Sequence, residues 1–248
     1  MALNTDKNSY TVIFSIVMVV IVGSILAGFA NGLKPKIKAN ERFEKQQNIL
    51  YALGKNENEG PNDVVFVPTD RVEAEFEKYI KTQYVIQGDK ITENDQAYLI
   101  DIKKEANKAK SGDYERKLPI FVGEKDGQTV YVVPVRGKGL WDAIWGFVAM
   151  DNSMTVTGVF FDHKGETPGL GAEIKQRYFM DDFTGEKFLD GGAFEGIKVA
   201  KGNNDPKNED TTDNEVDALA GATITGDGVT AMLKKDIKMY VPYFKSLN

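Results

Sequence analysis

The chain has 248 residues, of which 42% are hydrophobic and 27% charged, and its formal net charge is −6. This composition is typical of a globular protein, and the length fits one membrane segment plus one domain of roughly 200 residues. The acidic balance argues against binding of nucleic acid. The chain has no cysteine and one histidine, His163, which excludes disulfides, an iron–sulfur cluster ligated by this chain alone and a histidine-rich metal site. Redox chemistry would therefore require an organic cofactor, and we expect no metal site.

Residues 11–30 form an uncharged apolar stretch, TVIFSIVMVVIVGSILAGFA. At about 1.5 Å per residue, such a helix spans the hydrocarbon core of a membrane. The alternative is a signal peptide cut after Ala30, because Gly28-Phe29-Ala30 resembles a small-x-small cleavage site. A weakly basic leader and a long apolar run favour a retained membrane helix. Lysines concentrate after the stretch, which by the positive-inside rule would put the following domain in the cytoplasm, although the rule is weak for large domains.

The segments after the membrane stretch alternate between helical and extended patterns. Residues 36–53 predict a continuing helix that stops at Gly54, and 55–63 read as a polar linker. Residues 64–67 predict a short strand. A helix capped by Thr69 or Asp70 follows, with an apolar face formed by Val72, Phe76 and Ile80.

Two strand pairs and a final helix make up the rest of the pattern. Residues 118–122 and 129–135 flank Asp126-Gly127, which predicts a hairpin, and 143–150 pair with 155–161. Further elements are a strand over 194–200 and a helix from about Asp227, capped by Thr225. Strands and helices do not alternate regularly, so the predicted fold class is α+β, with an antiparallel sheet and flanking helices. The acidic segment 203–215 lacks the spacing of an EF-hand loop and is interpreted as a solvated loop.

Three segments carry residues suited to binding a flat, phosphorylated ligand. In Asp217-Ala-Leu-Ala-Gly-Ala-Thr-Ile-Thr225, the small Gly221 and Ala222 precede two threonines near a helix start, where free amides favour an anion. In Gly165-Glu-Thr-Pro-Gly-Leu-Gly171, a tight turn presents Leu170 and backbone amides. In Gly137-Lys-Gly-Leu-Trp141, Trp141 offers a stacking face, as does Trp145. From the residues alone, a helix cap, an ordinary connection and core aromatics remain the alternatives.

The occurrence of these segments together and in this order resembles the FMN-binding domain family. Over nearly the full chain, the sequence is similar to the family of C subunits of the sodium-translocating NADH:quinone reductase, including QQNILYALG at 46–54. The resemblance implies that Thr223 is esterified to the phosphate of FMN by a separate flavin transferase. It implies further cofactor contacts by a larger set of residues: Leu140, Trp141, Trp145, Glu166, Thr167, Gly169, Leu170, Gly171, Asp217, Gly221, Ala222 and Thr225. Position 220 is alanine where the family usually has serine or threonine.

The resemblance also implies an organisation and a role. Residues 1–33 would form the tail and membrane helix, 34–63 a juxtamembrane helix and linker, and 64–248 the FMN-binding domain. The protein would be a single-pass protein of the bacterial inner membrane with its domain in the periplasm, against the lysine distribution. It would be one subunit of an oxidoreductase, inactive alone, that relays electrons from NADH towards quinone while other subunits export sodium. Two alternatives remain: the G subunit of the homologous ferredoxin:NAD reductase complex, and an anchored ligand-binding module without redox function.

Overall fold

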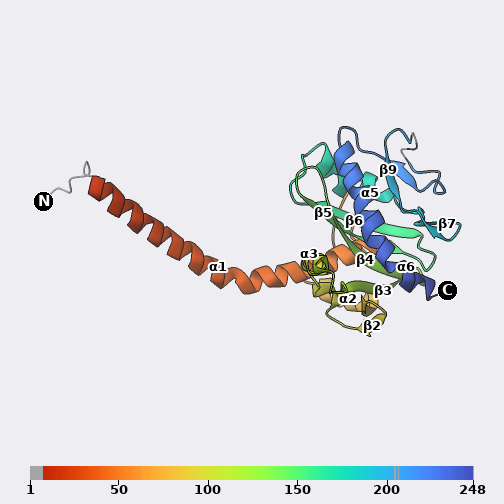
Figure 1. Cartoon of the computed structure of the whole chain (residues 1–248), viewed down its shortest axis with the longest axis horizontal. Helices are drawn as coiled ribbons and strands as arrows, with labels where there is room; N and C mark the ends of the chain where they lie inside the picture. The colour runs from red at the N-terminus through yellow and green to blue at the C-terminus, as the bar shows by residue number, and fades with distance from the viewer. Residues whose placement is uncertain (1–7, 204, 206, 248) are drawn as a thin grey trace. The chain divides into compact units, whose positions relative to one another are not determined.

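The computed structural model describes residues 8–203, 205 and 207–247 (Figure 1). It contains two compact units, residues 1–42 and 43–248. One helix, α1 (Asn8–Ala52), supplies the described part of the first unit and the start of the second, and it continues through Pro35. The predicted helix over 36–53 is confirmed, and Gly54 ends it with φ +85°.

The N-terminal part of α1 has the character of a membrane span. Its large apolar side chains between Val12 and Leu33 are exposed to the surroundings. Among the described residues, α1 is the one helix that is long and apolar enough to cross a membrane. An apolar surface of this kind is consistent with a membrane anchor.

The second unit is built on an antiparallel sheet with the strand order β2-β1-β3-β4-β5-β6. Its strands are β1 (Ile80–Gln87), β2 (Lys90–Glu93), β3 (Leu118–Lys125), β4 (Gln128–Lys138), β5 (Ala143–Met150) and β6 (Val156–His163). Both predicted strand pairs are confirmed. At the β3–β4 turn, Asp126 and Gly127 have φ values of 52° and 78°, as a two-residue hairpin of left-handed residues requires.

Helices cover this sheet on both faces, which confirms the predicted α+β class. The helices are α2 (Val72–Tyr79), α3 (Ile102–Lys108), α4 (Arg177–Asp181), α5 (Thr223–Ile237) and α6 (Val241–Lys245). The long α5 lies along β4 (Figure 1). The close approach depends on Gly137, where a Cβ would lie 2.7 Å from the Cβ of Met232. On the opposite face, Tyr51 at the end of α1 packs edge-on against Phe160, with ring centroids 5.8 Å apart.

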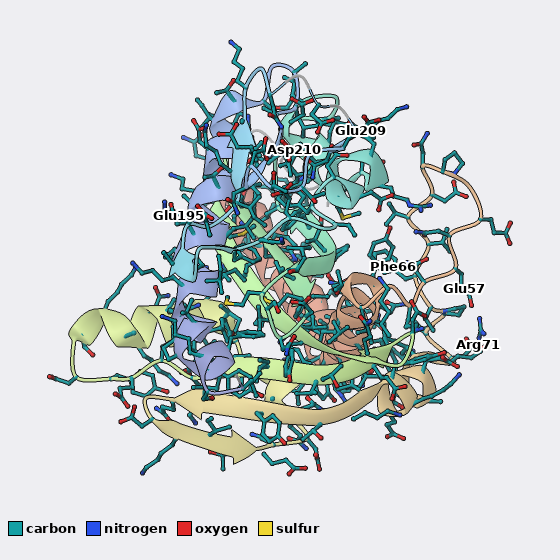
Figure 2. The ribbon with its side chains drawn as sticks, turned by 90° about the vertical axis from the view of Figure 1, so that its right-hand side faces the viewer. Glu57, Phe66, Arg71, Glu195, Glu209 and Asp210 are labelled. Atoms are coloured by element: carbon teal, nitrogen blue, oxygen red, sulfur yellow. The ribbon has the colours of Figure 1, made fainter. Side chains whose placement is uncertain are left out.

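Two local predictions are wrong. Residues 64–67 form no strand, because they have no neighbouring strand to pair with. The backbone there bonds to an adjacent loop instead (Glu57 N to Val65 O, 3.0 Å), and Phe66 packs on Tyr51 (Figure 2). The helix before β1 lacks a side-chain cap from Thr69 or Asp70 and begins after Arg71. Ile80, expected on that helix, is the first residue of β1.

Short elements complete the fold beyond β6. They are β7 (Leu189–Asp190), β8 (Ala193–Phe194), β9 (Lys198–Ala200), β10 (Glu215–Asp217) and the 3₁₀ turns at Ala97–Leu99, Ala109–Ser111, Gly171–Lys175 and Lys238–Tyr240. The predicted strand over 194–200 is interrupted: β8 ends at Phe194 and β9 begins at Lys198, because the chain turns at Gly196 with φ +84°. β9 pairs in parallel with β10. The acidic segment between them includes Glu209 and Asp210 (Figure 2), and Asn204 and Pro206 lie outside the described residues.

Beneath this acidic segment, Glu186 is completely buried. Asn208 Nδ2 donates to its Oε1 at 2.8 Å, while Glu186 Oε2 and Asn208 Oδ1 have no partner within the described residues. Burial raises the pKa of Glu186 to about 7, against the hydrogen bond from Asn208, and the charges of Asp213 and Asp210 add to the rise. The protonated form therefore suits the folded state best.

We expect Glu186→Gln to increase stability at pH 8 but not at pH 5. The pKa of Glu186 is higher in the folded chain than the ordinary 4.5, so the folded state binds more protons and loses stability as pH rises towards 7. Glutamine does not ionise and escapes this loss, which is on the order of 2–3 kcal/mol. Urea unfolding of the full chain at both pH values measures it. The exposed Glu209→Gln (Figure 2) is the control, and an equal gain at both pH values would refute the expectation.

Candidate functional site

The site begins where α5 begins, and the structure corrects the predicted start of this helix. α5 starts at Thr223, not at about Asp227, so Thr225 lies in its first turn and caps nothing. Gly221 turns the chain with φ +71°, and Gly226 N already bonds to Ala222 O at 2.9 Å. Gly226 and Gly228 have low helix propensity, and burial of Val229 and Met232 against the sheet stabilises the helix despite them.

The two threonines of this turn have different environments. Thr223 is exposed and stands at the first helical position, where backbone amides have no partner within the helix and the helix dipole is positive. Thr225 is only 1% exposed, and its hydroxyl donates to Glu166 Oε2 at 2.7 Å. Of the two threonines, Thr223 therefore has the accessible side chain.

The turn at 165–171 lies against the start of α5. Gly169 has φ +75°, Leu170 N bonds to Thr167 O at 3.1 Å, and Gly169 N bonds to Glu173 Oε1 at 2.9 Å. These bonds leave the side chain of Leu170 41% exposed. A Cβ at Gly221 would lie 2.8 Å from Leu170 Cδ2. The lack of a side chain at Gly221 therefore leaves room for Leu170.

The third segment follows β4 and lies beside the turn at 165–171. The indole N–H of Trp141 donates to Thr167 Oγ1 at 3.1 Å, and the ring is 66% exposed. Trp145 lies elsewhere: successive side chains of a strand point to opposite faces, and the side chain of Ile144, its neighbour in β5, points towards Gly139, where an added Cβ would lie 3.1 Å from Ile144 Cγ2. The ring of Trp145 stacks under Arg136, 5.8 Å from the guanidinium carbon.

Glu166 connects all three segments. Its carboxylate is 4% exposed and accepts bonds from Trp141 N (2.9 Å), from the amides of Leu140 and Asp142 (3.3 Å each) and from Thr225. Burial opposes ionisation, but the hydrogen bonds from Thr225 and the three amides outweigh it and hold the pKa of Glu166 below its ordinary value. His163 holds the backbone of Glu166 in place, since the Nδ1 of His163 accepts from Glu166 N at 3.2 Å.

These segments enclose an open hollow of about 220 Å³. It is lined by Leu140, Glu166, Thr167, Leu170, Gly171, Gly221, Ala222, Thr223, Ile224 and Thr225. Of the predicted site residues, Trp141 and Gly169 lie beside the hollow without lining it, while Asp217 in β10 and Trp145 do not line it either. Ile224, 57% exposed, was missed because it lies before the predicted start of the helix, where a single apolar residue between two threonines gives no sign that it lines a site.

Comparison with known proteins assigns the chain. The C subunit of the Na⁺-translocating NADH-quinone reductase of Neisseria meningitidis serogroup B is 31% identical over 259 residues, covering 100% of this chain and 98% of that protein. The chain belongs to this family of C subunits. The C subunit from Vibrio anguillarum is also 31% identical, and the match covers 92% of this chain and 90% of that protein. The crystal structure of the C subunit from Parabacteroides distasonis superposes with a TM-score of 0.72 at 32% identity, covering 87% of this chain and 98% of that one.

Within the chain, residues 139–238 match the FMN-binding domain model. This range begins at the Gly139 turn, contains the turn at 165–171 and ends with α5, so it encloses every residue that lines the hollow. The chain is therefore an FMN-binding oxidoreductase subunit. The described residues contain no group of three or more acidic, histidine or cysteine side chains arranged for a metal ion.

Proposed function

We propose that this chain is the membrane-anchored flavoprotein subunit of a sodium-translocating NADH:quinone reductase and relays electrons through an FMN bonded to Thr223. The observation that carries the proposal is the exposed Thr223 hydroxyl at the first position of α5, inside the hollow that the FMN-binding domain encloses. Membership of the family of C subunits supports the role in the complex.

The residues of the hollow fit a flavin phosphate at one end and an apolar ring at the other. The amides at the start of α5 and the small residues Gly221 and Ala222 suit a phosphate group. Leu140, Leu170 and Ile224 are 45%, 41% and 57% exposed, an unusual cost in water that a flat apolar ring would relieve. The Thr167 hydroxyl, which accepts from Trp141, can still donate to the polar edge of such a ring. Bound FMN would accept and release electrons in a chain that has no cysteine for thiol redox chemistry.

The attachment of FMN to Thr223 is a phosphoryl transfer, in which one bond to phosphorus forms and another breaks. The Thr223 oxygen forms a bond to the phosphorus of FMN, and its proton passes to a base. Free FMN would have to expel water, so the donor is a flavin nucleotide with a phosphoanhydride, such as flavin adenine dinucleotide, whose nucleotide half leaves as the anhydride bond breaks. A separate flavin transferase supplies this step.

The other subunits supply the rest of the pathway. NADH and quinone react elsewhere in the complex, and sodium export is coupled there, since the apolar span 11–30 carries no ionisable side chain for an ion path. The domain lies on the periplasmic side of the inner membrane, where the transferase acts. α1 anchors the domain and offers a packing helix.

Co-expression tests the proposal. The full chain, produced with an exported flavin transferase and purified in detergent, should be yellow and keep its flavin absorption after acid precipitation. The same chain produced without the transferase should be colourless. Flavin that passes entirely into the acid supernatant would refute the covalent link, and a colourless chain in both cultures would indicate an anchored module without redox function.

We expect Leu170→Ala to change the flavin absorption spectrum and redox midpoint of the loaded chain while the fold persists. The side chain is partly exposed at the wall of the hollow, so its loss removes ring contact without opening a core cavity. Leu99→Ala is the control, because Leu99 is similarly exposed, at 38%, but does not line the hollow. Identical spectra and midpoints for Leu170→Ala and the wild type would remove this leucine from the flavin site.

A further inference from the structure

The buried carboxylate of Glu166 is the point at which the three site segments meet. One of its oxygens takes the hydroxyl of Thr225, in the same helical turn as Thr223. The other takes the amide of Trp141 at 2.9 Å. The carboxylate therefore links the first turn of α5 to the loop that carries Leu140 and Trp141.

The space around Glu166 is reserved by two glycines. A Cβ at Gly139 would lie 2.6 Å from Glu166 Oε1, and a Cβ at Gly171 would lie 2.7 Å from Oε2 and closer still to Thr225 Oγ1. Any side chain at either glycine would displace the carboxylate. Glu166 is thus held in one place by the backbone on both sides as well as by its donors.

We propose that Glu166 is a positioning residue for the Thr223 hydroxyl, acting through Thr225 and the loop at 140–142 rather than by contact with the flavin. The inference rests on the proposed function, since it concerns how the acceptor hydroxyl is presented for phosphoryl transfer. Both oxygens of Glu166 are engaged by this chain's own donors. A misplacement of about 1 Å in a reacting group can lower a rate by roughly a hundredfold.

Only a carboxylate suits this set of partners. Four N–H or O–H groups point at Glu166, and an ionised carboxylate accepts at both oxygens. A glutamine of the same shape accepts at one oxygen and presents N–H bonds at the other position, where it would face a donor. Glu166→Gln therefore keeps the volume but breaks part of the connection.

The test measures the initial rate of FMN attachment to the full chain in detergent, with purified flavin transferase and flavin adenine dinucleotide. We expect Glu166→Gln and Thr225→Val each to lower kcat at least about tenfold with an unchanged KM for the flavin donor, the pattern of lost alignment rather than lost binding. Thr225→Ser retains the hydroxyl and should restore the rate to within about twofold of wild type. The exposed Glu195→Gln (Figure 2) is the control for loss of a charge.

The double variant Glu166→Gln/Thr225→Val separates one connection from two independent effects. If both groups act through their shared hydrogen bond, the double variant is no slower than the slower single variant, whereas independent effects multiply. Attachment at the wild-type rate in Thr225→Val, or multiplying effects, would overturn the positioning role. Absence of FMN on the wild-type chain itself would overturn the proposed function and this inference together. Unfolding curves identify a variant that fails to fold, and the Thr225→Val and Thr225→Ser pair then decides the matter.

Discussion

Thr223→Ala is expected to abolish covalent FMN, whereas Thr225→Ala retains it after prolonged incubation with the transferase. The two threonines stand in one helical turn and both line the hollow, but Thr223 is exposed. Thr225 is buried, and its hydroxyl is engaged by Glu166. Loss of the Thr225 hydroxyl should slow the attachment of FMN, because the first turn of α5 loses its hydrogen bond to Glu166. The acceptor oxygen of Thr223 stays in place.

Intact-mass measurement of the two variants distinguishes the threonines. Thr223→Ala should show the mass of the unmodified chain, and the complex that contains it should lose quinone reductase activity. Thr225→Ala should show an FMN-sized increment. The reverse pattern, with the increment on Thr223→Ala alone, would identify Thr225 as the acceptor and would require its buried hydroxyl to leave Glu166.

Gly228→Ala is expected to destabilise the domain by about 2–3 kcal/mol, although alanine is the better helix former by about 1 kcal/mol. An added Cβ at this position would collide with the carbonyl oxygen of Lys138 and lie 3.3 Å from the Cα of Gly139. These are backbone atoms and cannot rotate away. α5 would have to move off the end of β4, and the start of the helix would part from the Gly139 turn.

Gly226→Ala is the matched control, two residues earlier in the same helix. Its Cβ would meet only the side chain of Val199, at 3.0 Å from Cγ1, which can shift by a few tenths of an ångström. We expect its stability to stay within about 1 kcal/mol of wild type because the gain in helix propensity offsets this contact. Urea unfolding of the full-length variants gives the comparison. Equal stability of the two alanine variants would show that close packing at Gly228 is unimportant.

The sequence predicted those parts of the fold that depend on local signals. Asp126-Gly127 specifies its hairpin because both residues adopt positive φ readily. The strand expected at 64–67 fails because an apolar run forms a strand only beside a partner, which no local pattern reveals. The start of β1 was missed because Ile80 also continues the helical spacing of Val72 and Phe76.

The candidate site was predicted in its segments but not in its connections. The sequence pointed to Thr223, Leu140 and Leu170, and the structure places all three at one hollow. It also suggested Thr225 as a helix cap, because threonine is a favoured capping residue and the helix was expected to begin at about Asp227. The bond from Thr225 to Glu166 joins residues 59 positions apart, and tertiary contacts of that kind leave no periodic trace. Trp145 looked equivalent to Trp141 until the strand placed it on the other face.

Peptide mapping of the native chain tests directly whether FMN is bonded to Thr223. Trypsin should release residues 208–234 as one peptide, which contains Thr211, Thr212, Thr223, Thr225 and Thr230. We expect this peptide to be fluorescent and to carry one FMN-sized mass increment, which fragmentation should locate on Thr223. An unmodified peptide from yellow protein, or an increment on any other threonine, would contradict it.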